Sequence, residues 1–186
     1  ILIGLVGSEM CIRDRNNTVK SRSLAASLIK QGSIEVNGRI CTKASFAVDE
    51  NDNIRIIGEM PKYVGRGGLK LEKALSHYRL HLDGSVCIDI GASTGGFTDC
   101  MLQNGAVKVY SVDVGTDQLD EKLRNDPRVF SMEKTDIRNC VGSLPAVDFI
   151  GIDVSFISLK LVLPSAYALL KDGGECVALI LSLIHI

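Results

Sequence analysis

Hydrophobic and polar positions change their spacing near Gly84, and this change divides the chain into two kinds of structure. Before it, the segment Ser21–Lys30 places its three large apolar residues on one helical face, which predicts a short amphipathic helix. Two β-type runs follow at Ser33–Val36 and Asn53–Ile57. We therefore expect one helix and a small sheet in this first part of the chain.

Beyond Gly84, apolar β-type runs alternate with helical segments. The expected strands are Val86–Ile90, Val107–Val112, Val129–Glu133, Val147–Asp153 and Glu175–Ile180. The expected helices are Phe97–Gln103, Gln118–Arg124 and Leu159–Leu170, the last closed by Lys171–Gly174. Regular alternation of this kind predicts a parallel sheet covered by helices on both faces. The predicted fold class is therefore α/β, with a Rossmann-like sheet after a smaller module.

A glycine-rich basic segment, residues 61–68, separates the two parts and is predicted to be a linker. A helix is expected to start directly after it at Leu69, with Leu71, Ala74, Leu75 and Tyr78 facing inward. This organisation gives a first module over residues 16–60, a linker over 61–68 and a larger domain over 69–186.

Composition and charge support two modules with different partners. Apolar residues make up 46% of the chain and charged residues 23%, which excludes global disorder. Residues 16–70 carry nine lysines or arginines against five acids, whereas residues 71–186 carry ten against fifteen. A basic first part joined to an acidic second part indicates two modules with different partners.

The six cysteines contain no Cys-x-x-Cys pair, which argues against zinc ribbons and thioredoxin-type redox sites. We expect reduced thiols, several of them in the core, and no bound metal. Reduced thiols indicate a cytoplasmic protein. The apolar segments at the two chain ends are too short for a signal core or a membrane span, so no membrane role is expected.

The chain ends also have an unusual coding pattern. Codons for Met10–Arg15 and for Leu181–Ile186 can be chosen that are reverse complements apart from their end bases. Such a pair resembles a sequencing-adapter repeat translated at both ends of a DNA fragment. We therefore expect residues 1–15 and 181–186 to be foreign and the chain to be truncated at both ends.

The segment Val86–Thr98 carries the most informative chemistry. An apolar strand runs into a turn containing Gly91, Ser93, Gly95 and Gly96, and Phe97 opens the next helix. Glycines let the backbone approach a ligand, and a helix N-terminus offers free N–H groups. The spacing fits the dinucleotide fingerprint G-x-G-x-x-G poorly. A ligand-free tight turn is the alternative to a cofactor site.

Three of the expected strands end at an aspartate. Asp113 follows the second strand, 22 positions after Gly91, where an acid can bind ribose hydroxyls of either NAD or S-adenosylmethionine. Asp136 follows the third strand and Asp153 ends the fourth. Open α/β sheets bind ligands at this carboxyl edge, so these acids are candidate site residues. Solvated acids at strand ends are the alternative.

Three motifs in one order carry a resemblance to a known family. They read Gly65-Arg-Gly-Gly-Leu-Lys70-Leu, then Asp89-Ile-Gly-Ala-Ser-Thr-Gly-Gly-Phe-Thr-Asp-Cys100, then Asp153-Val-Ser-Phe-Ile-Ser-Leu159. Together they resemble the TlyA (hemolysin-A-like) rRNA methyltransferases. That family joins an FtsJ-type 2′-O-methyltransferase domain to an RNA-binding module of the ribosomal-protein-S-four kind. Ser21-Arg22, Gly32 and Val36-Asn37-Gly38 resemble the latter module.

The resemblance implies roles for individual residues. Gly91, Ser93, Gly95, Gly96 and Phe97 would bind S-adenosylmethionine, with Gly95 and Phe97 at its methionine end. Asp113 would hold the ribose and Asp136 would lie near the adenine.

Lys70 and Asp153 match the first two members of the family's Lys-Asp-Lys-Glu catalytic set. Methyl transfer to a ribose 2′-oxygen needs that oxygen in line with the methyl group and relieved of its proton. The second Lys and the Glu have no match before Ile186, so this chain is expected to be weak or inactive on its own.

The expected partner is ribosomal RNA or a ribosomal subunit. The candidate RNA-binding residues are Lys20, Arg22, Lys30, Arg39, Lys43 and Arg66. Few aromatic residues lie among them, which favours contacts to phosphates and RNA shape over base stacking. The expected function is therefore rRNA ribose 2′-O-methylation. A non-catalytic RNA-binding protein of the same fold and a nicotinamide-dependent oxidoreductase are the alternatives.

Overall fold

The computed structural model describes residues 19, 22–49, 51–58, 60–155 and 157–180. The chain forms two compact units that divide between Pro61 and Lys62. The predictions for Lys20 and for the two chain ends fall outside the described residues.

The first unit packs one helix against a three-stranded antiparallel sheet. Its elements are α2 (Arg22–Lys30), β1 (Ile34–Val36), β2 (Arg39–Cys41) and β3 (Ile54–Ile56), with strand order β2-β1-β3. Leu28, Ile29 and Ile34 have no exposed surface and form the centre of its core. The predicted helix and two strands are confirmed. Strand β2 was missed because only one of its three residues is buried, which leaves no hydrophobic alternation to detect.

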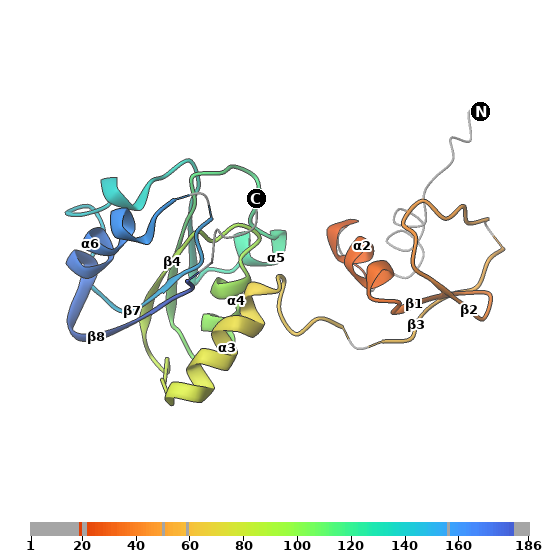
Figure 1. The fold of residues 1–186 in the computed structure, drawn as a ribbon, viewed down its shortest axis with the longest axis horizontal. Helices are drawn as coiled ribbons and strands as arrows, with labels where there is room; N and C mark the ends of the chain where they lie inside the picture. Colours follow the sequence, from red (N-terminus) through yellow and green to blue (C-terminus); the bar gives the residue numbers. More distant parts are fainter. Residues whose placement is uncertain (1–18, 20–21, 50, 59, 156, 181–186) are drawn as a thin grey trace. The chain divides into compact units, whose positions relative to one another are not determined.

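The second unit contains a five-stranded parallel sheet (Figure 1). Its strands are β4 (Val86–Ile90), β5 (Lys108–Val112), β6 (Val129–Met132), β7 (Val147–Ile152) and β8 (Leu170–Ala178). The strand order is β6-β5-β4-β7-β8, and every pairing is parallel. Strands β5 and β6 therefore lie on one side of β4, and β7 and β8 lie on its other side. This reversal makes the edge between β4 and β7 the topological switch point of the sheet.

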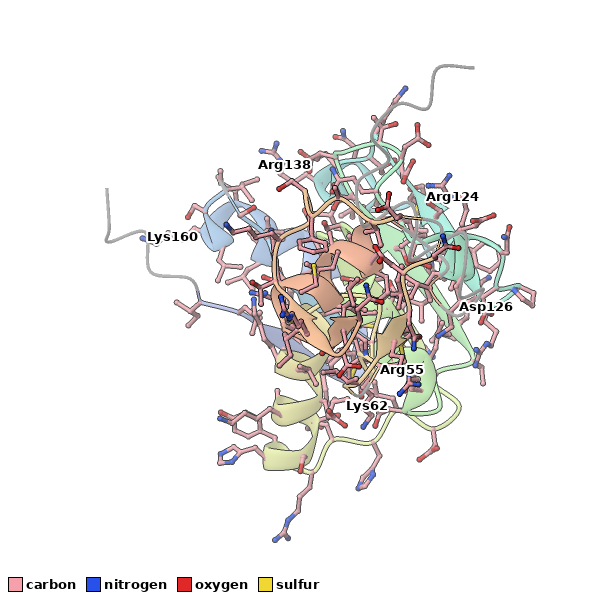
Figure 2. All side chains as sticks on the ribbon, turned by 90° about the vertical axis from the view of Figure 1, so that its right-hand side faces the viewer. Arg55, Lys62, Arg124, Asp126, Arg138 and Lys160 are labelled. Atoms are coloured by element: carbon pink, nitrogen blue, oxygen red, sulfur yellow. The ribbon has the colours of Figure 1, made fainter. Side chains whose placement is uncertain are left out.

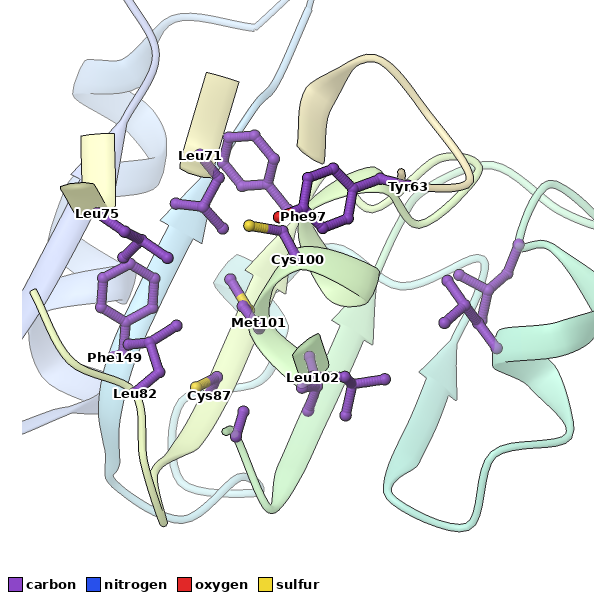
Figure 3. Packing of buried hydrophobic residues seen from close by; sticks show 14 residues of the cluster. Tyr63, Leu71, Leu75, Leu82, Cys87, Phe97, Cys100, Met101, Leu102 and Phe149 are labelled. Carbon is purple, nitrogen blue, oxygen red and sulfur yellow. The ribbon is translucent and has the colours of Figure 1, made fainter. Parts of the chain in front are cut away.

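Helices cover both faces of this sheet, as predicted (Figure 1). The helices are α3 (Gly67–Tyr78), α4 (Gly96–Gln103), α5 (Glu121–Arg124) and α6 (Leu159–Leu169), with a 3₁₀ turn η1 (Ile137–Asn139). One core joins α3 and α4 to Cys87 and Phe149 of the sheet, and Figure 3 shows Phe97 and Met101 within it. Ile88 and Ile150 point the other way, into the core under α6. Successive strand residues thus fill opposite cores.

Several predicted boundaries were wrong in informative ways. Helix α3 starts at Gly67 rather than Leu69, so its first turn is part of the predicted linker. Tyr78, predicted to face inward, is 66% exposed because it lies in the last turn, past the core contacts of Leu71 and Leu75. Strand β8 starts at Leu170, and the segment predicted to close α6 forms an irregularity within the strand pairing.

Four of the cysteines lie in the cores of the described residues. Cys41, Cys87, Cys100 and Cys140 are free and buried, and burial raises the pKa of the Cys87 thiol to about 12, which leaves it unreactive. None of the described helices is long and apolar enough to cross a bilayer.

Candidate functional site

A cleft of about 250 Å³ opens at the carboxyl ends of β4 and β7, at the switch point of the sheet. Its walls come from the turn after β4, from the start of α3 and from the segment after β7. The lining residues are Gly67, Gly91, Ala92, Ser93, Thr94, Gly96, Phe97, Asp153 and Ser155. Open α/β sheets bind their ligands at this position.

The glycine turn, residues 91–96, needs its glycines for two reasons. Gly91 has φ +84°, and a Cβ there would lie 2.6 Å from the Asp153 carbonyl oxygen, closer than atoms can approach. A Cβ at Gly96 would lie 3.0 Å from the Gly68 nitrogen and 3.1 Å from the Gly65 oxygen. Side chains at either position would push apart the walls of the cleft.

The start of α3 packs directly on the glycine turn. A Cβ at Gly65 would meet Thr94, and one at Gly67 would lie 3.3 Å from the Phe97 ring and 3.4 Å from Asp153 Oδ2. The glycines of the predicted linker are therefore part of the cleft. This role was not predicted from the sequence. The closely spaced glycines before Lys70 do indicate that another segment of backbone packs closely against them.

The Phe97 side chain lines the cleft and is almost fully buried. It is 2% exposed, and it packs on β7 where Gly151 leaves room for its ring. Its backbone belongs to the first turn of α4, whose N–H groups point toward the glycine turn. The ring thus fixes this helix N-terminus beside the cleft.

Asp113 lies at the end of β5 and is held in place by backbone amides. Its Oδ2 accepts a hydrogen bond from Ser93 N at 2.7 Å, and its Oδ1 accepts one from Gly115 N at 2.6 Å. A carboxylate oxygen has a second lone pair, so Asp113 can still accept hydrogen bonds from a pair of hydroxyls. The contact with Ser93 ties this carboxylate to the glycine turn.

Lys70 and Asp153 form an ion pair at the mouth of the cleft. Lys70 Nζ lies 3.3 Å from Asp153 Oδ2. The lysine side chain is 47% exposed and the aspartate 22%, so both groups can reach a ligand that enters from solvent. Residues 83 positions apart in the chain are thereby brought together, as their assignment to one catalytic set requires.

A fully buried carboxyl group lies beneath the turn. Asp89 Oδ2 accepts hydrogen bonds from Thr98 N at 2.8 Å and Thr98 Oγ1 at 2.7 Å, and Thr98 also bonds Ser111. Its Oδ1 has no hydrogen-bond partner among the described residues. Burial, with a smaller contribution from the nearby Asp153 and Asp113, raises the pKa of Asp89 to about 7.

Three predicted cofactor residues lie outside the cleft lining: Asp113, which bonds the turn from β5, Gly95 and Asp136. A Cβ at Gly95 would overlap Leu119 and Leu123, so this glycine accommodates the neighbouring loop. Asp136 caps η1 by accepting a hydrogen bond from Arg138 N at 2.9 Å, and it also pairs with the Arg138 guanidinium. Those hydrogen bonds lower the pKa of Asp136. Among the described residues no group of three or more metal-ligating side chains is present.

Four of the candidate RNA-binding residues are described with their side chains, and these four lie on the surface of their own units. Lys30 ends α2, Arg39 lies in β2, and Lys43 follows it; all three are exposed. Arg22 is the first residue of α2, and its side chain is not described. In the second unit, Arg66 is exposed and precedes the first residue of α3, one helical turn before Lys70.

Two family models match the chain. One, described as FtsJ-like methyltransferase, matches residues 63–186, and one, described as S4 domain, matches residues 18–54. The first contains the glycine turn, Asp113 and the Lys70–Asp153 pair. The second contains α2, β1 and β2 and ends at Ile54, the first residue of β3.

Individual proteins are similar over nearly the whole described chain. YqxC of Bacillus subtilis (strain 168), described as a candidate rRNA methyltransferase, is 44% identical over 87% of this chain. TlyA of Mycobacterium tuberculosis (strain H37Rv), described as a 16S/23S rRNA (cytidine-2′-O)-methyltransferase, is 37% identical over 89%. The solved structure of a candidate hemolysin from Streptococcus thermophilus superimposes with a TM-score of 0.67, at 43% identity over 93%. The chain spans 58%, 63% and 64% of the lengths of these three proteins.

Proposed function

This chain belongs to the FtsJ-like methyltransferase family and carries an S4 domain, and we propose that it transfers a methyl group from S-adenosylmethionine to a ribose 2′-hydroxyl of ribosomal RNA. The resemblance drawn from the sequence motifs is confirmed by the two family models and by the identity to YqxC and TlyA. The activity, the RNA substrate and the residue roles that follow are our proposal for this chain.

The observation that carries this proposal is the position of the Lys70–Asp153 pair beside the glycine turn. The pair stands at one end of the cleft, and Asp113 is tied to its other wall through Ser93. A cofactor bound along the turn would therefore extend from a carboxylate suited to ribose hydroxyls toward a lysine and an aspartate. Such an arrangement fits transfer of the methyl group to a substrate held beside Lys70.

The residues present fit S-adenosylmethionine. Gly91, Ser93, Gly96 and Phe97 line a cradle that a Cβ at either glycine would obstruct, and the amides of the turn and of α4 can face the amino-acid end. Asp113 would hold the ribose. When bound, S-adenosylmethionine supplies an activated methyl group on a sulfonium centre. Gly95 would act indirectly, by letting Leu119 and Leu123 support the turn.

Lys70 and Asp153 would act on the RNA hydroxyl. The Lys70 ammonium can orient the 2′-oxygen and stabilise the negative charge that develops as its proton passes to solvent water, while the oxygen takes the methyl group. Asp153 holds Lys70 through their 3.3 Å contact and balances its charge. Both side chains are open to solvent, so a large substrate can reach them.

The S4 domain and exposed cations would hold the RNA. Lys30, Arg39 and Lys43, together with Lys20 and Arg22, would contact phosphates, as would Arg66 near the catalytic lysine. The descriptions of YqxC and TlyA name rRNA, and that of TlyA names a cytidine 2′-oxygen. We extend this substrate class to the present chain, with a ribosomal subunit as partner and the cytoplasm as its location.

Two measurements test the proposal. Calorimetry compares binding of S-adenosylmethionine and NAD to the full chain; we expect binding of the first alone, and preferential NAD binding would favour an oxidoreductase instead. Transfer of tritiated methyl from S-adenosylmethionine to ribosomal subunits is then compared between the chain extended to the full length of its relatives and the Lys70→Ala variant of that longer protein. Lys73→Ala is the matched control, because Lys73 is an exposed lysine one turn further along α3. Equal transfer by all three proteins would remove Lys70 from the mechanism.

A further inference from the structure

The loop after β5, residues 114–120, packs against the glycine turn. Ser93 Oγ donates a hydrogen bond to Gln118 Oε1 at 3.1 Å, and Asp120 N donates one to Thr94 O at 3.2 Å. Leu119 lies directly against Gly95, where a Cβ would approach its Cδ1 to 2.8 Å. Three consecutive residues of the turn are therefore in contact with this loop.

Glu133, the residue after β6, holds the same loop from outside. Its Oε2 accepts a hydrogen bond from Asp117 N at 2.8 Å, and its Oε1 accepts from Gln118 N at 3.2 Å and lies 3.5 Å from Leu119 N. One carboxylate thus faces three successive backbone amides, and these contacts lower the pKa of Glu133. Asp117 has φ +52°, a left-handed conformation that is uncommon for non-glycine residues and that aspartate adopts more readily than most.

Arg124 of helix α5 also holds the loop of residues 114–120 (Figure 2). Its Nη2 donates a hydrogen bond to Leu119 O at 3.1 Å. It lies 3.6 Å from Asp117 and 4.0 Å from Glu133, so it neutralises the charge that collects around the loop. The adjacent Lys134 N donates to Gly115 O at 2.9 Å, which joins the end of β6 to the start of the loop.

We propose that Glu133 is a positioning residue for the cofactor site, because it fixes residues 117–119, of which Gln118 bonds Ser93 and Leu119 packs on Gly95 of the glycine turn. Glu133 does not line the cleft. It acts through the loop, and no motif of the sequence analysis assigned it a role. The identity of the ligand, S-adenosylmethionine, rests on the proposed function, whereas the support of the loop does not.

The test measures S-adenosylmethionine affinity and loop protection in the full chain. If Glu133→Ala lets the turn reach its binding conformation one tenth of the time, the Kd for S-adenosylmethionine rises about tenfold. We expect the KM for S-adenosylmethionine to rise in step while kcat stays near its original value. Hydrogen exchange at the amides of residues 117–119 should accelerate as well. Glu133→Gln keeps one acceptor oxygen, so its Kd should lie between those of the chain and Glu133→Ala.

Glu121→Gln is the matched control, since Glu121 is an exposed glutamate in the neighbouring helix α5. It should leave the Kd and the exchange rates unchanged. An unchanged Kd in Glu133→Ala, or a loss confined to kcat, would overturn the inference. If Glu133→Ala fails to fold, Arg124→Gln removes the second support and should raise the Kd, and an unchanged Kd there would equally overturn it. Absence of S-adenosylmethionine binding to the original chain would instead refute the proposed function, and the exchange rates would still test the role of Glu133.

Discussion

Replacing Asp89 with asparagine should change the pH dependence of stability more than any other single carboxyl substitution in the cleft region. Asp89 has no exposed surface, and burial raises its pKa from an ordinary value of 3.8 to about 7. The folded protein therefore keeps a proton on Asp89 between these two values, whereas the unfolded chain releases it. A difference of this size corresponds to about 4 kcal/mol in the free energy of unfolding.

The sign follows from which state binds the proton. Because the pKa of Asp89 is raised in the folded protein, the free energy of unfolding falls as the pH rises from about 4 to about 7. Above pH 7 Asp89 is ionised in both states, so its titration lowers the free energy of unfolding no further. Asparagine has the same shape and no charge. We therefore expect the stability of Asp89→Asn relative to the original chain to increase by up to about 4 kcal/mol between pH 4 and pH 8.

Urea unfolding of both proteins across pH 4–8 measures this difference, and comparing them cancels the titration of other groups. Asp148→Asn is a control of opposite sign. The Lys171 ammonium and the Val86 amide lower the pKa of Asp148, so its replacement should cost stability at pH 7 and cost less at low pH. A stability difference for Asp89→Asn that stays constant from pH 4 to pH 8 would refute the reasoning.

Three further predictions concern the cofactor, the turn and the RNA. Asp113→Ala should weaken S-adenosylmethionine binding by about 1.5–3 kcal/mol, the scale of hydrogen bonds to a charged group, and an unchanged calorimetric Kd would show that Asp113 does not hold the ribose. Gly91→Ala should lower the free energy of unfolding by more than Gly142→Ala, because both have positive φ but only Gly91 has a backbone oxygen, 2.6 Å away, in the path of the new Cβ. Equal urea midpoints for these two variants would argue against a tight cleft wall. RNA binding should fall steeply with salt, and removing Arg39 should reduce the slope of log K against log salt by about 1 if it contacts one phosphate. A slope unchanged in Arg39→Ala would count against that contact.

Much of the larger domain could be predicted from sequence because its signals are local. Each strand of a doubly covered parallel sheet is a continuous apolar run, so β4 and β7 were found nearly to their ends. The glycine turn was recognisable because its residue types are needed for backbone conformation and close approach. In contrast, the short strand β2 and the helical start at Gly67 have no periodicity of their own, and tertiary contacts determine them.

Several residues that the structure brings together at the cleft could be predicted from the sequence, but the contacts that support them could not. Asp113 and Asp153 both lie near the turn because the carboxyl ends of parallel strands meet at one edge. Lys70 reaches Asp153 because the start of α3 packs on the glycine turn. Sequence analysis could not find Glu133, since a single glutamate at a strand end carries no signal until the loop that it holds is seen in space. It also could not show that Asp136 is engaged by Arg138.

The position of the transferred methyl group tests the central claim most directly. Ribosomal subunits are labelled with tritiated S-adenosylmethionine by the chain extended to the full length of its relatives. The subunits are then digested to nucleosides, and the labelled nucleoside is identified by chromatography and mass spectrometry. We predict label on a ribose 2′-oxygen, and loss of that label with Lys70→Ala but not with Lys73→Ala. Label on a base, or 2′-O-methylation that persists in the Lys70 variant, would contradict the account of this cleft.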